Sequence, residues 1–344
     1  MKAVVRKSLE PEQMFFEDVP IPEVKENEVL IKVKAVGVCG TDTHMYTGHV
    51  VTTVPVIVGH EFCGIVEQLG KKVTSVKIGD KVVSRLNIGV CGICRNCLTG
   101  NPHMCEHRTC PGFAIHGAYA EYISMDEKML LKLNAHIPIE VGATIEPMAI
   151  VAHALLERTK IEPEDFVVIF GPGPIGLISL QMANLYGARQ VVMVGTNVDE
   201  KQRMPLARKI GASYILNAQV DDVAEEIMKL TNNKGADLVI EASGAENAIN
   251  CGFRVLRRQG RMCVLGLPTG RELNISWLTA AEKALQVIFS YSSSPWSWNL
   301  VVHMVNRGAI DTSTLISHIK PLKEYKAMFE EIKKGQVIKG VLLP

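Results

Sequence analysis

The hydrophobic pattern of the first 150 residues predicts a β-rich region. Short apolar runs such as Glu28–Val36 and Val56–Val58 alternate with turns that contain glycine, proline and asparagine. Runs of this length, interrupted by residues that favour turns, are typical of β-strands.

After about residue 150 the pattern changes to short apolar runs that alternate with segments of helical length. Strands that are apolar along almost their whole length are buried on both faces, so this alternation predicts a parallel sheet covered by helices. From about Ser292 the pattern is again mixed helix and strand. The predicted strands are 166–170, 191–194, 238–242 and 262–266, and the predicted helices are 175–186, 200–210 and 223–231.

The composition narrows the class of protein. The chain has 344 residues, of which 47% are hydrophobic and 21% charged, so it can form two hydrophobic cores. A formal net charge of +1 gives no electrostatic reason to expect nucleic acid or an anionic membrane as a partner. No apolar stretch approaches the roughly 20 residues that span a bilayer, and the first residues lack the apolar core of a signal peptide. We therefore expect a soluble, cytoplasmic protein whose nine cysteines stay reduced, and their clustering indicates metal binding.

Four cysteines form the most specific pattern in the chain: Cys91, Cys94, Cys97 and Cys105. Two-residue spacers let one tight loop place three thiolates around an ion, and a short further loop supplies the fourth. Four sulfur ligands fill the coordination sphere of zinc, so this site should be structural. The spacing alone also allows an iron–sulfur cluster or a set of unrelated small apolar side chains. Outside the pattern, Cys63 and Cys110 are unassigned, and we expect Cys251 and Cys263 in the core.

A second candidate metal site combines residues that lie far apart in the sequence. Cys39 and His60 each stand next to a β-like run, and Glu61 and Glu146 offer carboxylates. A catalytic zinc needs about three protein ligands and one position for the substrate. Cys39 and His60 would supply two of them, and Glu61 or Glu146 the third, directly or through a bound water. Each of these residues alone is more often structural, so the assignment depends on the features that accompany it.

A glycine-rich turn follows the predicted strand 166–170 and opens the predicted helix 175–186. In this setting GxGxxG predicts dinucleotide binding, because the glycines permit a tight turn, close approach of the pyrophosphate and close helix–strand packing. The helix N-terminus supplies N–H groups and a dipole for the anion. We assign to the cofactor Gly171, Gly173, Pro174, Ile175 and Gly176, together with Gly266 at the end of a later strand.

The sequence leaves the cofactor open between NAD(H) and NADP(H). A carboxylate at the end of the second strand would bind the ribose 2′-hydroxyl of NAD. Here a glycine, Thr196 and Asn197 follow that strand, and the first acid is Asp199. Thr196, Asn197 and Arg203 would tolerate a 2′-phosphate, whereas Asp199 would bind the 2′-hydroxyl if the loop folds back. Asp199 could equally serve only to cap the helix that follows.

Together these motifs resemble the zinc-containing medium-chain dehydrogenase/reductase superfamily, and the sorbitol (polyol) and threonine dehydrogenase branch in particular. The resemblance rests on Cys39-Gly-Thr-Asp, Gly59-His-Glu61, the four-cysteine lobe, Ile145-Glu-Pro-Met-Ala and the glycine-rich turn. It implies an α/β protein with a GroES-like, β-rich catalytic domain and an inserted Rossmann domain with a doubly wound parallel sheet. The expected ranges are 1–152 with a structural-zinc lobe at 89–108, 153–290 for the Rossmann domain, and 291–344 for the returning segment.

The resemblance also implies two zinc ions per chain and a homodimer or homotetramer. The activity that it implies is hydride transfer from a secondary hydroxyl of a polyol to NAD(P)+. In polyol dehydrogenases the glutamate of the Glu-Pro step takes part in the zinc site, so Glu146 is carried over. Thr41 and His44 would relay the hydroxyl proton to solvent. Met45 stands where relatives often have an aromatic residue, so sorbitol itself is not a specific expectation.

Other activities fit parts of the pattern. Threonine 3-dehydrogenase and sugar-acid or polyol-phosphate dehydrogenases share the same motifs. A zinc-free reductase of enones would lack the cysteine lobe and the Cys39–His60 pair. The neutral charge balance and the glycine-rich turn argue against a zinc-ribbon protein that binds nucleic acid. We therefore expect a small-molecule substrate and neither a nucleic-acid nor a membrane partner.

Overall fold

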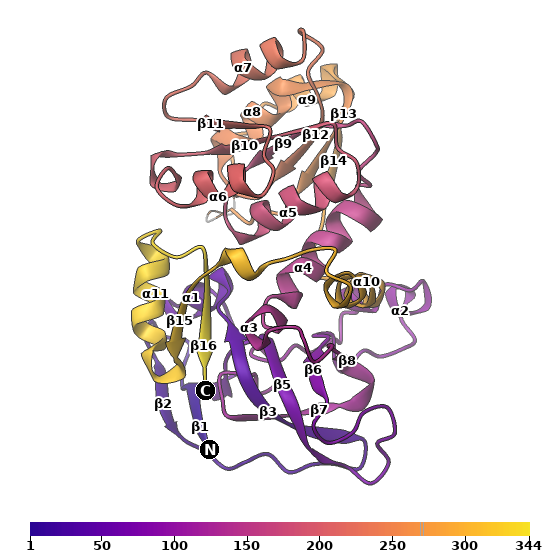
Figure 1. The fold of residues 1–344 in the computed structure, drawn as a ribbon, viewed down its shortest axis with the longest axis vertical. Coiled ribbons are helices and arrows are strands. Elements are labelled where there is room, and N and C mark those ends of the chain that lie inside the picture. Colours follow the sequence, from indigo (N-terminus) through magenta and orange to yellow (C-terminus); the bar gives the residue numbers. More distant parts are fainter. Residues whose placement is uncertain (269, 271) are drawn as a thin grey trace. The chain divides into compact units, whose positions relative to one another are not determined.

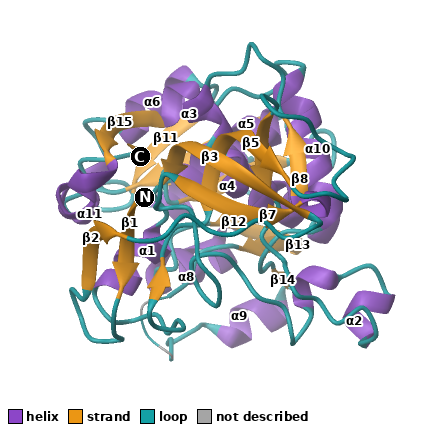
Figure 2. Ribbon diagram, turned by 90° about the horizontal axis from the view of Figure 1, so that it is seen from below, coloured by secondary structure: helices purple, strands orange, loops and turns teal. Residues whose placement is uncertain are grey.

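The computed structural model describes residues 1–268, 270 and 272–344. The chain divides into two compact units, Met1–Ala149 with Ser294–Pro344 and Ile150–Ser293. The first unit is therefore made of two chain segments, with the second unit inserted between them. Both termini belong to the first unit and lie near one another (Figure 1, Figure 2).

The first unit is β-rich, as the sequence predicts, and β3 (Glu28–Gly37) is its longest strand. Its apolar side chains, including Ile31 and Val33, join the main core of this unit. One sheet has the order β2-β1-β4, and another the order β15-β16-β3-β5-β6-β8, with β7 paired to β3. The other strands are β1 (Lys2–Arg6), β2 (Met14–Asp18), β4 (Val56–Ile57), β5 (Glu61–Leu69), β6 (Lys81–Ser84), β7 (Tyr122–Asp126), β8 (Leu130–Lys132), β15 (Ile316–Pro321) and β16 (Lys339–Leu343).

Short helices connect these strands, and none of the helices in the described residues is long and apolar enough to cross a membrane. α10 begins at Pro295, where the Ser294 hydroxyl accepts a hydrogen bond from the backbone N–H of Ser297 as an N-cap. The helices are α1 (Gly40–Tyr46), α2 (Arg95–Leu98), α3 (Ile139–Gly142), α10 (Pro295–Asn306) and α11 (Tyr325–Lys333), and α4 (Ile145–Ala152) leads from the first unit into the second.

The second unit is a parallel, doubly wound sheet with strand order β11-β10-β9-β12-β13-β14. Its central strand β9 is apolar and buried along its whole length because helices cover both faces of the sheet: α5 and α6 lie on one, and α7, α8 and α9 on the other (Figure 1). The strands are β9 (Phe166–Phe170), β10 (Gln190–Gly195), β11 (Tyr214–Asn217), β12 (Ala236–Glu241), β13 (Leu256–Val264) and β14 (Gln286–Phe289). The helices are α5 (Pro174–Leu185), α6 (Arg203–Lys209), α7 (Val223–Leu230), α8 (Glu246–Val255) and α9 (Trp277–Glu282).

One helix begins later than the sequence predicts. The expected helix 200–210 is α6 from Arg203, preceded by a separate 3₁₀ turn over Asn197–Asp199. Thr196 caps that turn, and the Asp199 carboxylate accepts the backbone N–H of Thr196 in return, so the two residues close a capping box. Asp199 is therefore the third residue of a 3₁₀ turn and not the N-cap of the longer helix.

Candidate metal and cofactor sites

The candidate catalytic metal site lies where β3 ends and β5 begins. Their antiparallel register pairs Gly37 with Glu61, which brings Cys39, just beyond β3, near His60 and Glu61. The ligand atoms of Cys39, His60 and Glu61 all lie within 4.8 Å of one another. Gly37 is required in this register because a Cβ atom there would collide with the Glu61 carboxylate. Strand pairing thus joins residues that are distant in sequence.

A buried carboxylate faces the imidazole of this group. His60 is 6% exposed, and its Nδ1 lies 3.6 Å from Oδ1 of Asp42. Neither atom has a hydrogen-bond partner among the residues described. Because Nδ1 faces Asp42, Nε2 is the ring nitrogen left for a metal ion. The mixed thiol, imidazole and carboxylate donors of Cys39, His60 and Glu61 fit a zinc ion.

Asp42 is in turn fixed by a tyrosine. Its Oδ2 accepts hydrogen bonds from the backbone N–H of Cys39 and from the Tyr119 hydroxyl, each at 2.9 Å. Burial, and then the charge of Asp42, raises the pKa of Tyr119, so the hydroxyl stays protonated and donates. The Tyr119 ring packs against Gly59, where a Cβ atom would collide with it. Tyr119 therefore connects the segment that carries Cys39 with the one that carries His60.

A lysine from the C-terminal strand neutralises Glu61. β16 pairs with β3 through Val341 and Gly37, which brings Lys339 to the same end of the sheet. The Lys339 ammonium group donates to Glu61 Oε2 and, at 2.9 Å, to the carbonyl oxygen of Val38. Lys339 is 3% exposed and Glu61 1% exposed, so each charge depends on the other for compensation.

The other three predicted site residues lie around this group. Glu146 is 8% exposed, and burial together with the nearby charge of Glu61 raises its pKa to about 7. It stands outside the set of ligand atoms that lie within 4.8 Å of one another. On α1, the Thr41 hydroxyl accepts a hydrogen bond from the Cys39 thiol at 3.5 Å, and His44 is exposed. Asp42, Tyr119 and Lys339 were not assigned from the sequence.

The four cysteines of the lobe converge on one point. The ligand atoms of this set lie within 4.8 Å of one another, and Sγ of Cys91 lies 3.6 Å from Sγ of Cys105 and 4.0 Å from Sγ of Cys97. A tetrahedron with zinc–sulfur bonds of about 2.3 Å has edges of about 3.8 Å, so these separations fit zinc. The backbone N–H of Cys94 also donates to Sγ of Cys91 at 3.3 Å, which helps to hold this thiol in place.

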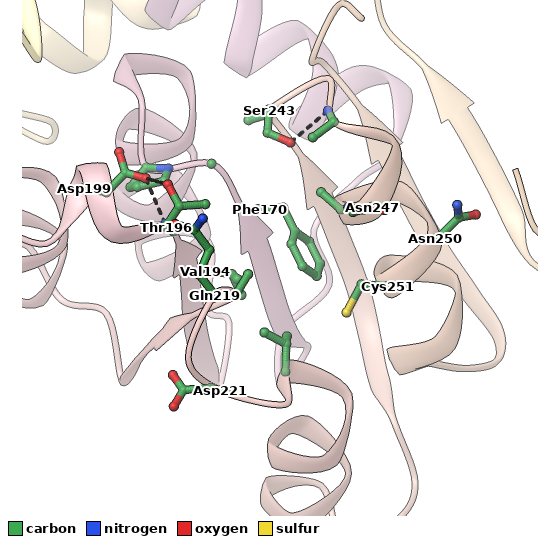
Figure 3. Close-up of a pocket in the computed structure, with 18 of the residues that line it drawn as sticks. Phe170, Val194, Thr196, Asp199, Gln219, Asp221, Ser243, Asn247, Asn250 and Cys251 are labelled. Atoms are coloured by element: carbon green, nitrogen blue, oxygen red, sulfur yellow. Dashed lines mark hydrogen bonds between the residues drawn. The ribbon is translucent and has the colours of Figure 1, made fainter. Parts of the chain in front are cut away.

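A cavity of about 1230 Å³ opens in the second unit beyond the carboxyl ends of β9, β10 and β12 (Figure 3). Gly171 has a φ of 95°, which makes the tight turn, and no atom lies within 4 Å of a Cβ placed on Gly173. A Cβ on Gly176 would collide with the Gly171 carbonyl. The turn therefore leaves room for an anion at the N-terminus of α5.

The predicted cofactor residues divide into two groups by their place relative to this cavity. Those that line it are Gly171, Gly173, Thr196, Asp199 and Arg203. Those outside its lining are Pro174, Ile175, Gly176, Asn197 and Gly266.

One cysteine lies elsewhere than expected. Cys251 is half-buried: it packs against the core of the second unit and also lines this cavity with Phe170 and Asn247, so it stands at the edge of the core and not inside it (Figure 3). It lies on α8, an amphipathic helix that packs its apolar residues against the sheet, and Cys251 stands at the edge of that apolar face. Cys263 is fully buried, as predicted.

Comparison with known proteins places both units in known families. The family described as Alcohol dehydrogenase GroES-like domain matches residues 25–135, and Zinc-binding dehydrogenase matches residues 174–306. The chain is 35% identical over 343 residues to D-arabitol-phosphate dehydrogenase of Enterococcus avium, covering 99% of this chain and 97% of that protein. It is 35% identical over 355 residues to L-threonine 3-dehydrogenase of Bacillus licheniformis, covering 100% and 99%. A zinc-binding dehydrogenase structure from Sinorhizobium meliloti 1021, bound to NADP, matches with a TM-score of 0.91 and 29% identity, covering 100% of this chain and 99% of that one.

Proposed function

This chain belongs to the zinc-containing medium-chain dehydrogenase superfamily, and from that premise we propose that it oxidises a secondary hydroxyl of a small polyol or polyol phosphate with NAD(P)+. The observation that carries the proposal is the convergence of half-buried Cys39 with buried His60 and Glu61 in a chain that also has a glycine-rich turn at the cavity of the second unit. Similarity to a D-arabitol-phosphate dehydrogenase along the whole chain supports a polyol or its phosphate as the substrate class.

In this proposal Cys39, His60 and Glu61 hold the catalytic zinc, and Glu146 lies beside it. When bound, zinc supplies Lewis-acid polarisation of the hydroxyl, and the nicotinamide supplies the hydride acceptor. The protein brings three donors together, which would leave one position of a four-coordinate zinc for the substrate. Asp42 orients His60, and Lys339 balances the charge of Glu61.

The hydroxyl proton has to leave a buried site, and we assign its path to α1. The Thr41 hydroxyl can both accept and donate a proton and is hydrogen-bonded to the Cys39 thiol. His44 is exposed on the same helix and can pass a proton to solvent. Thr41 and His44 would thus lead from the half-buried Cys39 to the surface.

The four cysteines of the lobe hold a second, structural zinc in this proposal. Four thiolates leave no coordination position for a substrate. The expected metal content is therefore two zinc ions per chain, one in each cluster.

The substrate class is tested by a panel that includes D-arabitol phosphate, galactitol 1-phosphate, sorbitol, xylitol, 2,3-butanediol and L-threonine, each with NAD+ and NADP+. We expect the highest kcat/KM on a polyol or polyol phosphate. Similarity to an L-threonine 3-dehydrogenase favours an amino-acid alcohol as the second candidate. Turnover of L-threonine alone would select that candidate, and no turnover of any alcohol would contradict both.

We further propose that the enzyme is a cytoplasmic homodimer or homotetramer. β14 is an edge strand of the parallel sheet, and Trp277, Phe289 and Tyr291 are exposed by 71%, 68% and 57%. An open strand edge beside large exposed aromatic residues favours contact with a second copy. All nine cysteines are free, which is typical of a reducing compartment. Sedimentation velocity tests the assembly, and a monomer at micromolar concentration would contradict it.

A further inference from the structure

We infer that the cofactor cavity selects NADP(H) over NAD(H), with Arg203 contacting the 2′-phosphate. This inference rests on the proposed function, because it assumes that a nicotinamide dinucleotide binds in the cavity of the second unit. It concerns the end of β10, the strand whose last residues face the ribose in folds of this kind.

The end of β10 itself carries no carboxylate and has little room for a side chain. Gly195 is the last residue of the strand, and a Cβ atom there would lie 2.7 Å from Cε of Met204 and 3.0 Å from Cγ of Pro172. Thr196 follows with a neutral side chain that lines the cavity. The position from which an acid would bind the 2′-hydroxyl of NAD therefore carries no negative charge.

The nearest acid, Asp199, already uses both carboxylate oxygens within the protein (Figure 3). Its Oδ2 accepts from the backbone N–H and the hydroxyl of Thr196 at 3.0 and 3.1 Å. Its Oδ1 accepts from the Arg203 guanidinium at 3.0 Å. The residue is 5% exposed. To bind a ribose hydroxyl, Asp199 would have to give up contacts that hold the 3₁₀ turn in place.

The two other aspartates of the cavity are likewise committed to the backbone. Asp221 Oδ2 accepts from the backbone N–H of Asn217 at 2.7 Å. Asp222 Oδ1 caps α7 through the N–H groups of Ala224 and Glu225 at 3.1 Å. Both follow β11, on the next strand, and neither stands at the end of β10. No acid of the cavity lining is thus placed to read the 2′-hydroxyl.

Arg203 supplies the positive charge that a phosphate requires. Its side chain is 20% exposed and lines the cavity beside Thr196 and Asp199. A guanidinium group can bind phosphate oxygens with two parallel hydrogen bonds, and the ion pair with Asp199 holds Arg203 at this end of the cavity. Thr196 donates its hydroxyl to Asp199 and carries no charge, so it places no carboxylate where the phosphate would bind. These features together favour the 2′-phosphate of NADP over the 2′-hydroxyl of NAD.

The test compares the binding of two fragments that differ only in that phosphate, 2′,5′-ADP and 5′-AMP, by isothermal titration calorimetry. We expect the wild-type protein to bind 2′,5′-ADP roughly tenfold to a hundredfold more tightly, as for hydrogen bonds to a charged group. Arg203→Ala should remove most of that difference. Lys201→Ala is the matched control, because Lys201 is an exposed cation of the same segment that does not line the cavity. This variant should still bind 2′,5′-ADP more tightly than 5′-AMP.

Asp199→Asn separates a direct contact from a general effect of charge. The amide keeps an acceptor for Thr196 and removes the negative charge next to the phosphate, so the preference for 2′,5′-ADP should increase. Equal binding of both fragments by the wild type would overturn the inference and leave the dehydrogenase function intact. Binding of neither fragment would overturn the cofactor function itself, and the preference with it.

Discussion

The two candidate zinc sites of the first unit are built in opposite ways. All four thiols of the lobe come from one segment, Cys91–Cys105, and they surround a point at its surface. The candidate ligands Cys39, His60 and Glu61 come from the ends of two paired strands. The first cluster is complete in itself, whereas the second depends on the packing of the unit around it.

The surroundings of the two clusters differ as much as their ligands. In the lobe, Ile93 and Leu98 are exposed by 81% and 72%, so this segment has little apolar core of its own. Around the second cluster lie the buried polar groups of Asp42, Tyr119 and Lys339. The contrast indicates that bound zinc would stabilise the fold in the lobe, whereas at Cys39 the fold would shape the metal site.

The largest expected effect comes from exchanging one cysteine in each cluster. Cys39→Ser should lower kcat at least about 10³-fold, because a zinc ion contributes several kcal/mol to the transition state, and should leave the melting temperature nearly unchanged. Cys94→Ser should instead lower the melting temperature strongly, because the lobe loses the metal that orders it. Steady-state kinetics and differential scanning calorimetry on both variants measure this. If both variants lose stability equally, the distinction between the sites is wrong.

A smaller effect is expected for Lys339→Met. In zinc-free protein this substitution should lower the free energy of unfolding by about 3–5 kcal/mol, because the buried charge of Glu61 loses its partner. If Glu61 binds zinc, the metal compensates that charge, so the penalty should shrink in the zinc-loaded protein. Urea unfolding with and without zinc measures both values. Lys2→Met, which breaks an exposed ion pair with Asp18, is the control and should change little. A penalty independent of zinc would assign the third ligand to another residue.

The smallest effect is expected for Tyr119→Phe. This substitution removes the hydroxyl that donates to Asp42 and keeps the ring packed on Gly59. We expect the zinc affinity at Cys39 to fall roughly tenfold, near the lower limit for groups that orient a ligand, while that of the lobe stays constant. Competition with a chromophoric chelator measures both sites in one sample. Equal loss at both sites would indicate a general loss of structure instead.

The sequence predicted the features that depend on local spacing. The GxGxxG turn between β9 and α5, and the four cysteines of the lobe, lie within short segments whose geometry follows from their spacing. The pairing of Cys39 with His60 was accessible only as a combination of weak signals. The register of β3 with β5 is what brings these two residues together.

The supporting residues could not be predicted because their contacts are non-local. Tyr119 lies 77 residues from Asp42, and Lys339 lies 278 residues from Glu61, and no spacing pattern joins either pair. The hydrogen bonds between Asp199 and Thr196 are local instead, because these two residues stand at the spacing of a capping box. That local signal was present in the sequence, and it accounts for the late start of α6 at Arg203.

The most direct test of the catalytic-metal assignment is anomalous scattering at the zinc absorption edge from crystals of the zinc-loaded protein. Two peaks are expected, one within the cysteines of the lobe and one between Cys39 and His60. A single peak in the lobe, with Cys39 and His60 bound to no metal, would contradict the account.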